Sequence, residues 1–62
     1  MKLLILGGGS NQVHAVKRAR AKGITTIVSD YYADAPGKDF CDVGELVSTF
    51  DAEANIRVAI KY

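Results

Sequence analysis

The sequence predicts an α/β fold in which helices cover a parallel sheet in three layers, with the element order β-α-β-β-α. Short apolar or β-branched runs, typical of strands, alternate with segments that have helical periodicity. The first apolar run, Leu3–Leu6, leads directly into three consecutive glycines. Because strands that alternate with helices usually pair in parallel through right-handed crossovers, one small domain of this type accounts for all 62 residues.

The first strand is expected over residues 2–6, where a continuous apolar run is typical of a strand buried on both faces. Ser10 or Asn11 is expected to cap a helix that continues to about Lys22, and Gly23 is placed to end it. The apolar stripe of this helix comprises Val13, Val16 and Ala19.

The second strand is expected over residues 24–29, of which five are β-branched, and Asp30 marks its carboxyl end. Residues 31–39 have the turn chemistry of a loop, and residues 40–42 are expected to form a turn or a short helix. A short third strand is expected over residues 45–48. Asp51 then caps a second helix, whose apolar positions are Ala52, Ile56, Ala59 and Ile60.

Composition and charge exclude several classes of function. The net charge of +1 creates no field that draws nucleic acid or an anionic membrane, so neither is expected as a partner. A single cysteine allows no internal disulfide, and together with one histidine it offers no metal-ligand set. No apolar run approaches the roughly 20 residues that span a bilayer, and no signal peptide is recognisable, so a cytoplasmic location is expected.

The strongest functional signal is the glycine run and the start of the helix after it. The residues of this candidate binding loop are Gly7, Gly8, Gly9, Ser10, Asn11 and Gln12. Three glycines permit a sharp turn and close approach of a ligand, while a helix N-terminus favours an anion. Asp30 ends the neighbouring strand, and the turn that contains Ala35 and Pro36 is expected above the same crevice. These residues predict a ligand site at the carboxyl ends of the first two strands.

Two other interpretations of this loop remain open. A dinucleotide site is supported by the glycines and Asp30, but the third glycine of its fingerprint falls on Gln12. Alternatively, the glycines serve only the strand-to-helix turn. No pair of side chains forms a catalytic constellation, so no catalytic residue is predicted.

The whole segment resembles the N-terminal domain of ATP-grasp ligases, often called the pre-ATP-grasp domain, which is Rossmann-like. The similarity rests on four features in this order: Leu3–Gly9, the helix that opens at Gln12, the strand end Val28–Asp30, and Asp34–Gly37. It covers almost all 62 residues and is strongest toward the carbamoyl-phosphate-synthase-like and biotin-carboxylase-like branch.

The resemblance implies that the parent protein is a ligase that joins a carboxylate to an amine or thiol through an acyl-phosphate. ATP and Mg²⁺ are implied as cofactors of the parent, bound by domains that this segment does not contain. The glycine loop is implied to face a small carboxylate substrate rather than ATP, so the segment alone is expected to have no ligase activity. In some family members an acidic residue follows the glycines; Asn11 and Gln12 depart from that pattern.

The alternatives to this hypothesis are the dinucleotide-binding half of an NAD(P)-dependent oxidoreductase and a non-enzymatic α/β association module. The sequence stops at its second helix, before the strand that such a helix normally precedes, so a truncated Rossmann-like domain is expected. The missing strand would leave residues 3–6 as an exposed apolar edge, which predicts a homo-oligomer. The missing ATP-grasp domains are the other expected partner.

Overall fold

The computed structural model describes residues 1–62 and confirms an α/β fold with a parallel sheet. Three strands, two α-helices and one 3₁₀ helix follow one another along the chain. In order they are β1 (Lys2–Leu6), α1 (Ser10–Ala21), β2 (Thr25–Asp30), the 3₁₀ helix η1 (Pro36–Asp39), β3 (Val43–Leu46) and α2 (Ala52–Lys61). The predicted order β-α-β-β-α is therefore correct.

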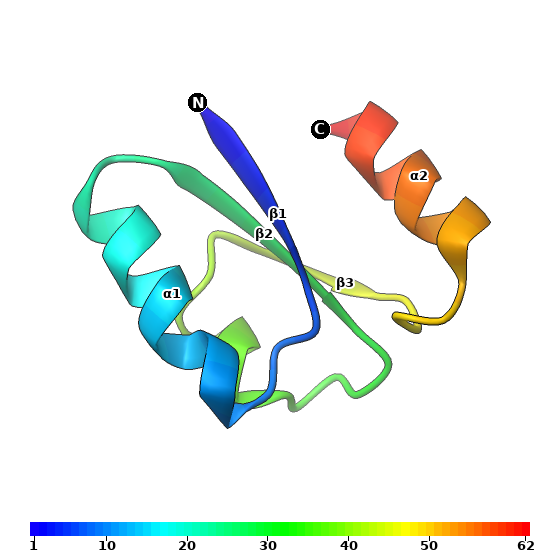
Figure 1. The fold of residues 1–62 in the computed structure, drawn as a ribbon, viewed down its shortest axis with the longest axis horizontal. Coiled ribbons are helices and arrows are strands. Elements are labelled where there is room, and N and C mark those ends of the chain that lie inside the picture. The colour runs from blue at the N-terminus through cyan, green and yellow to red at the C-terminus, as the bar shows by residue number, and fades with distance from the viewer.

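The sheet has the order β1-β2-β3, and both pairs of strands are parallel. The register places Leu6 beside Ser29 and Asp30 beside Leu46, so the carboxyl ends of all three strands lie at one edge. Figure 1 shows α1 and α2 on opposite sides of the sheet, which gives the expected three layers. The central strand β2 forms most of the core, since four of its residues are buried, from Thr26 to Ser29.

Helix α1 packs through the predicted stripe, in which Val16 and Ala19 are buried. The predicted N-cap was wrong. The N-cap residue is Gly9, and no side chain caps the helix. The predicted end is correct, because Lys22 is the C-cap and Gly23 adopts a φ of 77° that disfavours other residues.

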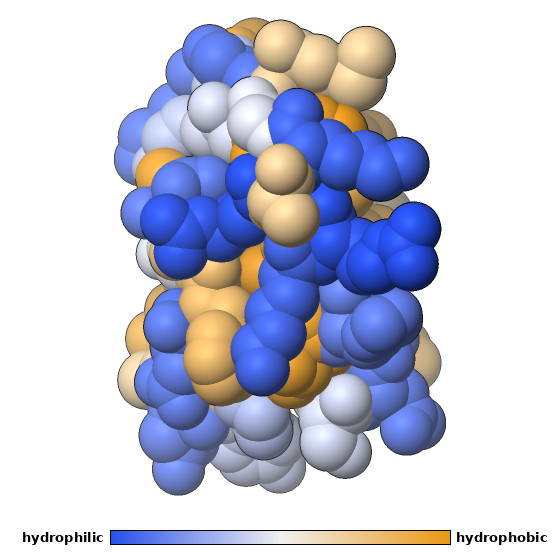
Figure 2. Space-filling view, turned by 90° about the vertical axis from the view of Figure 1, so that its left-hand side faces the viewer, coloured by the Kyte–Doolittle hydropathy of each residue, from blue (hydrophilic) through white to orange (hydrophobic).

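The outer face of α1 is hydrophilic, as Figure 2 shows for this side of the molecule. Two of its cations contact the segment that connects η1 to β3. The Nζ atom of Lys17 lies 4.2 Å from the centre of the Phe40 ring, and the Nε atom of Arg20 lies 3.3 Å from a carboxylate oxygen of Asp42. The basic cluster of α1 thus partly serves to hold this segment.

The predicted third strand was placed two residues too late. Asp42 fixes the actual start, because its carboxylate accepts hydrogen bonds from the backbone N–H of Thr26 at 2.8 Å and from the Thr26 hydroxyl at 3.1 Å. Pairing begins at the next residue, Val43, and ends at Leu46. The 3₁₀ helix lies within the predicted loop, at Pro36–Asp39, because proline favours the first helical position. Residues 40–42 form a turn and bends, which is the first of the two expectations for them.

Helix α2 begins as predicted, with the Asp51 side chain accepting a hydrogen bond from the backbone N–H of Ala54. Its buried face was predicted incorrectly. The buried residues are Asn55 and Val58, whereas Ile56 and Ile60 are exposed. The buried polar residue Asn55 shifts the inward face away from the apolar stripe that the sequence suggests.

Strand β1 is an edge strand, not a strand buried on both faces, since Leu3 and Leu6 are exposed. Its residues Leu4 and Leu6 line an open groove of about 410 Å³ against α2, together with Ala52, Ile56 and Ala59. Three residues of the predicted apolar stripe of α2 therefore face this groove rather than the core, and the fourth, Ile60, is exposed outside it. Neither helix has the length and apolar character needed to cross a membrane.

Candidate binding site at the carboxyl edge of the sheet

The glycine loop leaves β1 through a conformation that requires glycine. Gly7 has a φ of +91°, and its backbone N–H donates to the carbonyl oxygen of Ser29 at 2.7 Å, which extends the pairing of β1 with β2 by one residue. After this bond the chain turns away from the sheet toward α1. Gly7 therefore serves the strand-to-helix turn.

Gly8 is buried and permits close packing beneath the site. A Cβ atom at this position would lie 2.8 Å from Cγ1 of Val28 and 3.3 Å from Cβ of Ala35. The backbone carbonyl of Gly8 accepts a hydrogen bond from the N–H of Gly37 at 2.5 Å. Gly37 is equally constrained, because its own Cβ would lie 3.0 Å from the Gly8 backbone. Gly7 and Gly8 thus each have a structural role, Gly7 in the turn and Gly8 in the packing.

Gly9 differs from the two glycines before it. It is exposed, its φ is −64°, and an added Cβ would meet only the Gln12 side chain at an ordinary distance of 3.6 Å. Ser10 and Asn11 form the exposed first turn of α1, and the N–H of Gln12 donates to the Gly9 carbonyl at 2.9 Å. Neither the turn nor the packing requires glycine here, so Gly9 is the glycine best placed to face a ligand.

Asp30 links the two sides of the site. One carboxylate oxygen accepts the N–H of Gly8 at 2.8 Å, and the other accepts the N–H of Tyr32 at 2.9 Å. These hydrogen bonds, that from Gly8 first, hold the pKa of the Asp30 carboxyl below its ordinary value, and the charge of Lys38 lowers it further. Because both oxygens already bind backbone groups, Asp30 is less available to a ribose than the dinucleotide hypothesis requires.

The turn after β2 lies beside the glycine loop, as predicted. Ala35 is buried against Gly8, while Pro36 is exposed at the first position of η1. Lys38 donates from its Nζ atom to the carbonyl oxygen of Asp30 at 3.1 Å. The contact with the glycine loop is made by Ala35 and Gly37, and Pro36 sets the start of the 3₁₀ helix.

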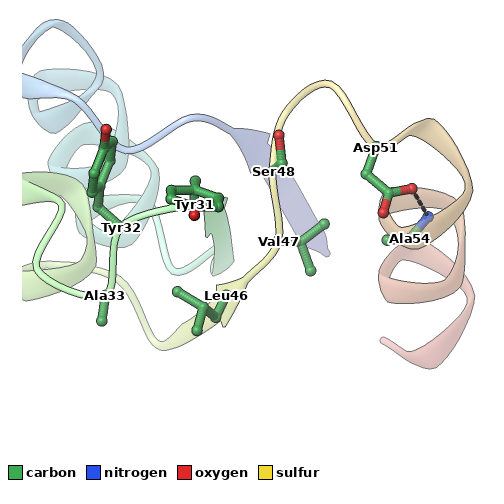
Figure 3. A pocket seen from close by; sticks show the side chains of 8 residues that line it. All are labelled: Tyr31, Tyr32, Ala33, Leu46, Val47, Ser48, Asp51 and Ala54. Carbon is green, nitrogen blue, oxygen red and sulfur yellow. Dashed lines mark hydrogen bonds between the residues drawn. The ribbon is translucent and has the colours of Figure 1, made fainter.

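Two adjoining open pockets lie at this edge and share Tyr31, Tyr32 and Ser48. The first, of about 620 Å³, is drawn in Figure 3, where the two tyrosines lie across Leu46 and Val47 from the capped start of α2. The second, of about 580 Å³, is lined by Gly9, Asp30, Tyr31, Tyr32, Ser48, Thr49 and Phe50. Both volumes are in the range of small-ligand sites.

Of the predicted site residues, Gly9 and Asp30 line a pocket. Gly7, Gly8 and Ala35 do not line it, but their hydrogen bonds and packing hold the adjoining backbone. Sequence analysis did not identify Ser48, Thr49 and Phe50 as site residues. The signal for the first two was present, because polar residues that directly follow a parallel strand lie at the carboxyl edge of its sheet. The early end of β3 at Leu46 brings them there.

The side chains of this chain do not form a metal site. No three His, Cys, Asp or Glu side chains come together in a way that could hold a metal ion, so the residues present do not fit the Mg²⁺ that the family resemblance implies. Asp30 is the acidic residue that lines the second pocket, and its carboxylate is bound to backbone groups. The arrangement is suited to binding a ligand.

Comparison with known proteins gave one informative likeness. No protein-family model and no curated protein matches the sequence. The solved structure of N5-carboxyaminoimidazole ribonucleotide synthetase from Thermotoga maritima matches it with a TM-score of 0.84 and 28% sequence identity. The match covers 97% of this chain but 16% of that one. Because that enzyme is an ATP-grasp ligase, the likeness supports the similarity of this chain to the N-terminal domain of ATP-grasp ligases.

Proposed function

We propose that this chain is the substrate-binding N-terminal part of an ATP-grasp ligase. The observation that carries the proposal is the structural match over 97% of the chain to an ATP-grasp ligase of which the chain spans 16%. The missing ATP-grasp domains of the parent protein are the proposed partners, and they bind the ATP and Mg²⁺ for which this chain has no fitting metal site.

The pocket at the carboxyl edge is the proposed substrate site. The exposed start of α1 at Gly9 offers backbone N–H groups to an anionic group, and Tyr31 and Tyr32 offer aromatic surface on the opposite wall. In the implied reaction, ATP phosphorylates a small carboxylate, and an amine or thiol then displaces the phosphate. This chain contributes binding and orientation of the substrate, and the chemistry belongs to the other domains.

Two finer assignments belong to the same proposal. The first is the carbamoyl-phosphate-synthase-like branch, which the motif order favours. The second is the substrate class: the name of the matched enzyme contains an imidazole ring, a ribose and a phosphate. In this pocket, the phosphate of a ribonucleotide could bind at the start of α1, beside Gly9, and its ring could stack on Tyr31 or Tyr32. We therefore propose a ribonucleotide as the partner of the carboxylate in the reaction.

The proposal is tested by measuring the mass and the ATP-dependent activity of the polypeptide that contains this segment in its source cells. An antibody to the segment is used to isolate that polypeptide, which is then supplied with ATP·Mg, bicarbonate and aminoimidazole ribonucleotide. We expect a mass several times 6.7 kDa and release of ADP that depends on the ribonucleotide. A mass of 6.7 kDa would overturn the ligase assignment, and ADP release without dependence on the ribonucleotide would overturn the substrate class.

A further inference from the structure

We propose that Asp30 is a positioning residue: its carboxylate fixes the two walls of the carboxyl-edge pocket relative to each other without binding the substrate. The proposal rests on the assignment of this pocket as the substrate site. It also replaces the expectation that Asp30 contacts the ligand directly.

The Asp30 carboxylate connects the glycine loop to the loop after β2, and both loops line the pocket. The Gly8 N–H that it accepts at 2.8 Å belongs to the residue directly before Gly9, which lines the pocket where α1 begins. The Tyr32 N–H that it accepts at 2.9 Å belongs to the loop after β2, which also lines the pocket. A movement of the carboxylate therefore changes the separation between the helix start and the tyrosine wall.

The backbone of Asp30 is itself firmly held. Its carbonyl oxygen accepts hydrogen bonds at 3.1 Å from the Nζ atom of Lys38 and from the N–H of Val47. Gly8 is equally fixed, because its carbonyl accepts the N–H of Gly37 and its Cα has no room for a side chain. The carboxylate thus connects anchored segments, which is what a positioning role requires.

The charge of Asp30 argues against contact with an anionic group of the substrate. The carboxylate is ionised at neutral pH, since hydrogen bonds from Gly8 and Tyr32 lower its pKa. A substrate that bears a phosphate or carboxylate would be repelled by it. Lys38 is the cation whose field acts on Asp30, and it also acts on Glu45 of β3.

The remaining ionisable neighbours belong to three segments. Tyr31 and Tyr32 belong to the loop after β2 and line the same pocket, Asp51 precedes α2 and lines the adjoining one, and Asp34 and Asp39 belong to the loop and to η1 without lining either pocket.

The hydrogen bonds can be tested in the wild-type chain by nuclear magnetic resonance. At neutral pH we expect a through-bond coupling between the Gly8 nitrogen and Cγ of Asp30, and a second between the Tyr32 nitrogen and the same carbon. As the pH falls, both amide protons should shift with one common midpoint below 3.8. Absence of either coupling, or two different midpoints, would overturn the shared attachment.

The effect on binding is tested with Asp30→Asn, whose amide keeps the shape but can accept only one of the two bonds. Asp34→Asn is the matched control, because Asp34 is exposed in the same loop. For aminoimidazole ribonucleotide we expect Asp30→Asn to weaken binding roughly tenfold, about the value of one charge-assisted hydrogen bond, and Asp34→Asn to leave it unchanged. Equal affinity in both variants would contradict the positioning role.

The two measurements separate failure of this inference from failure of the proposed function. If the wild-type chain binds no ribonucleotide but shows both couplings, the proposed substrate class is wrong and the hydrogen bonds from Gly8 and Tyr32 to Asp30 are confirmed. If it binds the ribonucleotide and lacks the couplings, the proposed function stands and the positioning role falls.

Discussion

Two adjacent glycines in the loop after β1 have different roles, and the difference can be measured. Gly8→Ala should lower the free energy of unfolding by about 1–3 kcal/mol, because its Cβ would lie 2.8 Å from Cγ1 of Val28. Gly9→Ser is the control and should change stability by less than about 0.5 kcal/mol, because serine is a favourable N-cap. Urea unfolding measures both, and equal losses would contradict the distinction.

Asn55 connects α2 to β2 and to the segment before the helix through its side chain. Its Oδ1 accepts the Ser29 hydroxyl at 2.7 Å, and its Nδ2 donates to the carbonyls of Ser48 and Asp51 at 3.0 Å. Asn55→Ala removes all three bonds but leaves only the buried Ser29 hydroxyl without a partner, because the Ser48 and Asp51 carbonyls keep the backbone N–H groups of Asp51 and Asn55 as donors. It should cost about 1–3 kcal/mol of unfolding free energy.

The control for this substitution is Ile56→Ala, which removes a larger but exposed side chain one residue later. It should cost less than about 1 kcal/mol. If Ile56→Ala destabilised the chain more than Asn55→Ala, the groove would be more important than the buried polar network.

At the scale of elements, three carboxylates connect segments that are distant in sequence, and this predicts acid sensitivity. Hydrogen bonds lower the pKa of Asp30 chiefly through Gly8, of Asp42 chiefly through the Thr26 backbone, and of Glu45 chiefly through Tyr62. A lowered pKa in the folded state means that the stabilisation is complete above the ordinary values of 3.8 and 4.5 and is lost as the pH falls through the lowered ones.

The melting temperature should therefore be nearly constant from pH 7 to about 5 and fall steadily below about 4. Asp42→Asn should lower stability at pH 7 and make this acid-dependent decrease smaller, whereas Asp34→Asn should leave the profile unchanged. A melting temperature that rises on acidification would show that these carboxylates do not stabilise the fold.

The type and order of the elements could be predicted because each has a local signal. The β-branched run identifies β2, Asp51 identifies the start of α2, and Gly23 ends α1. The misplaced features depend on contacts between distant segments. The start of β3 is set by Asp42 bonding to Thr26, and the buried face of α2 is set by Asn55 meeting Ser29. A sequence read locally contains neither contact.

The location of the candidate site could be predicted from the sequence, but the roles of its residues could not. Parallel strands and the glycine run indicate the carboxyl edge, and the pocket that contains Gly9 and Asp30 lies there. The roles of the residues depend on tertiary packing. Burial of Gly8 and the bonds from Asp30 to Gly8 and Tyr32 follow from how η1 and β2 meet the glycine loop. For that reason the positioning role that we propose for Asp30 could not be predicted from the sequence.

At the scale of the whole molecule, the outer edge of β1 pairs with no strand of this chain. It borders the apolar groove that contains Leu4, Leu6 and Ile56. Such an edge recruits another strand, and antiparallel pairing of two β1 strands would bring their apolar residues together. We propose that the 62-residue chain associates with a second copy through β1.

Sedimentation at several concentrations should show dimers of the 62-residue chain. Leu6→Lys places a charge on the free edge and should shift the population to monomers, whereas Leu46→Lys, an equally drastic change on the opposite edge strand, should not. Monomers at every concentration, or equal effects of the two variants, would contradict association through β1.

We propose that the carboxyl edge of this sheet binds substrate and that ATP binds elsewhere. A titration of the ¹⁵N-labelled chain with aminoimidazole ribonucleotide, and separately with ATP·Mg, tests it most directly. We expect saturable shifts of Gly9, Tyr31 and Ser48 with the ribonucleotide and none with ATP·Mg. Saturable shifts of the same residues with ATP·Mg, and none with the ribonucleotide, would contradict it.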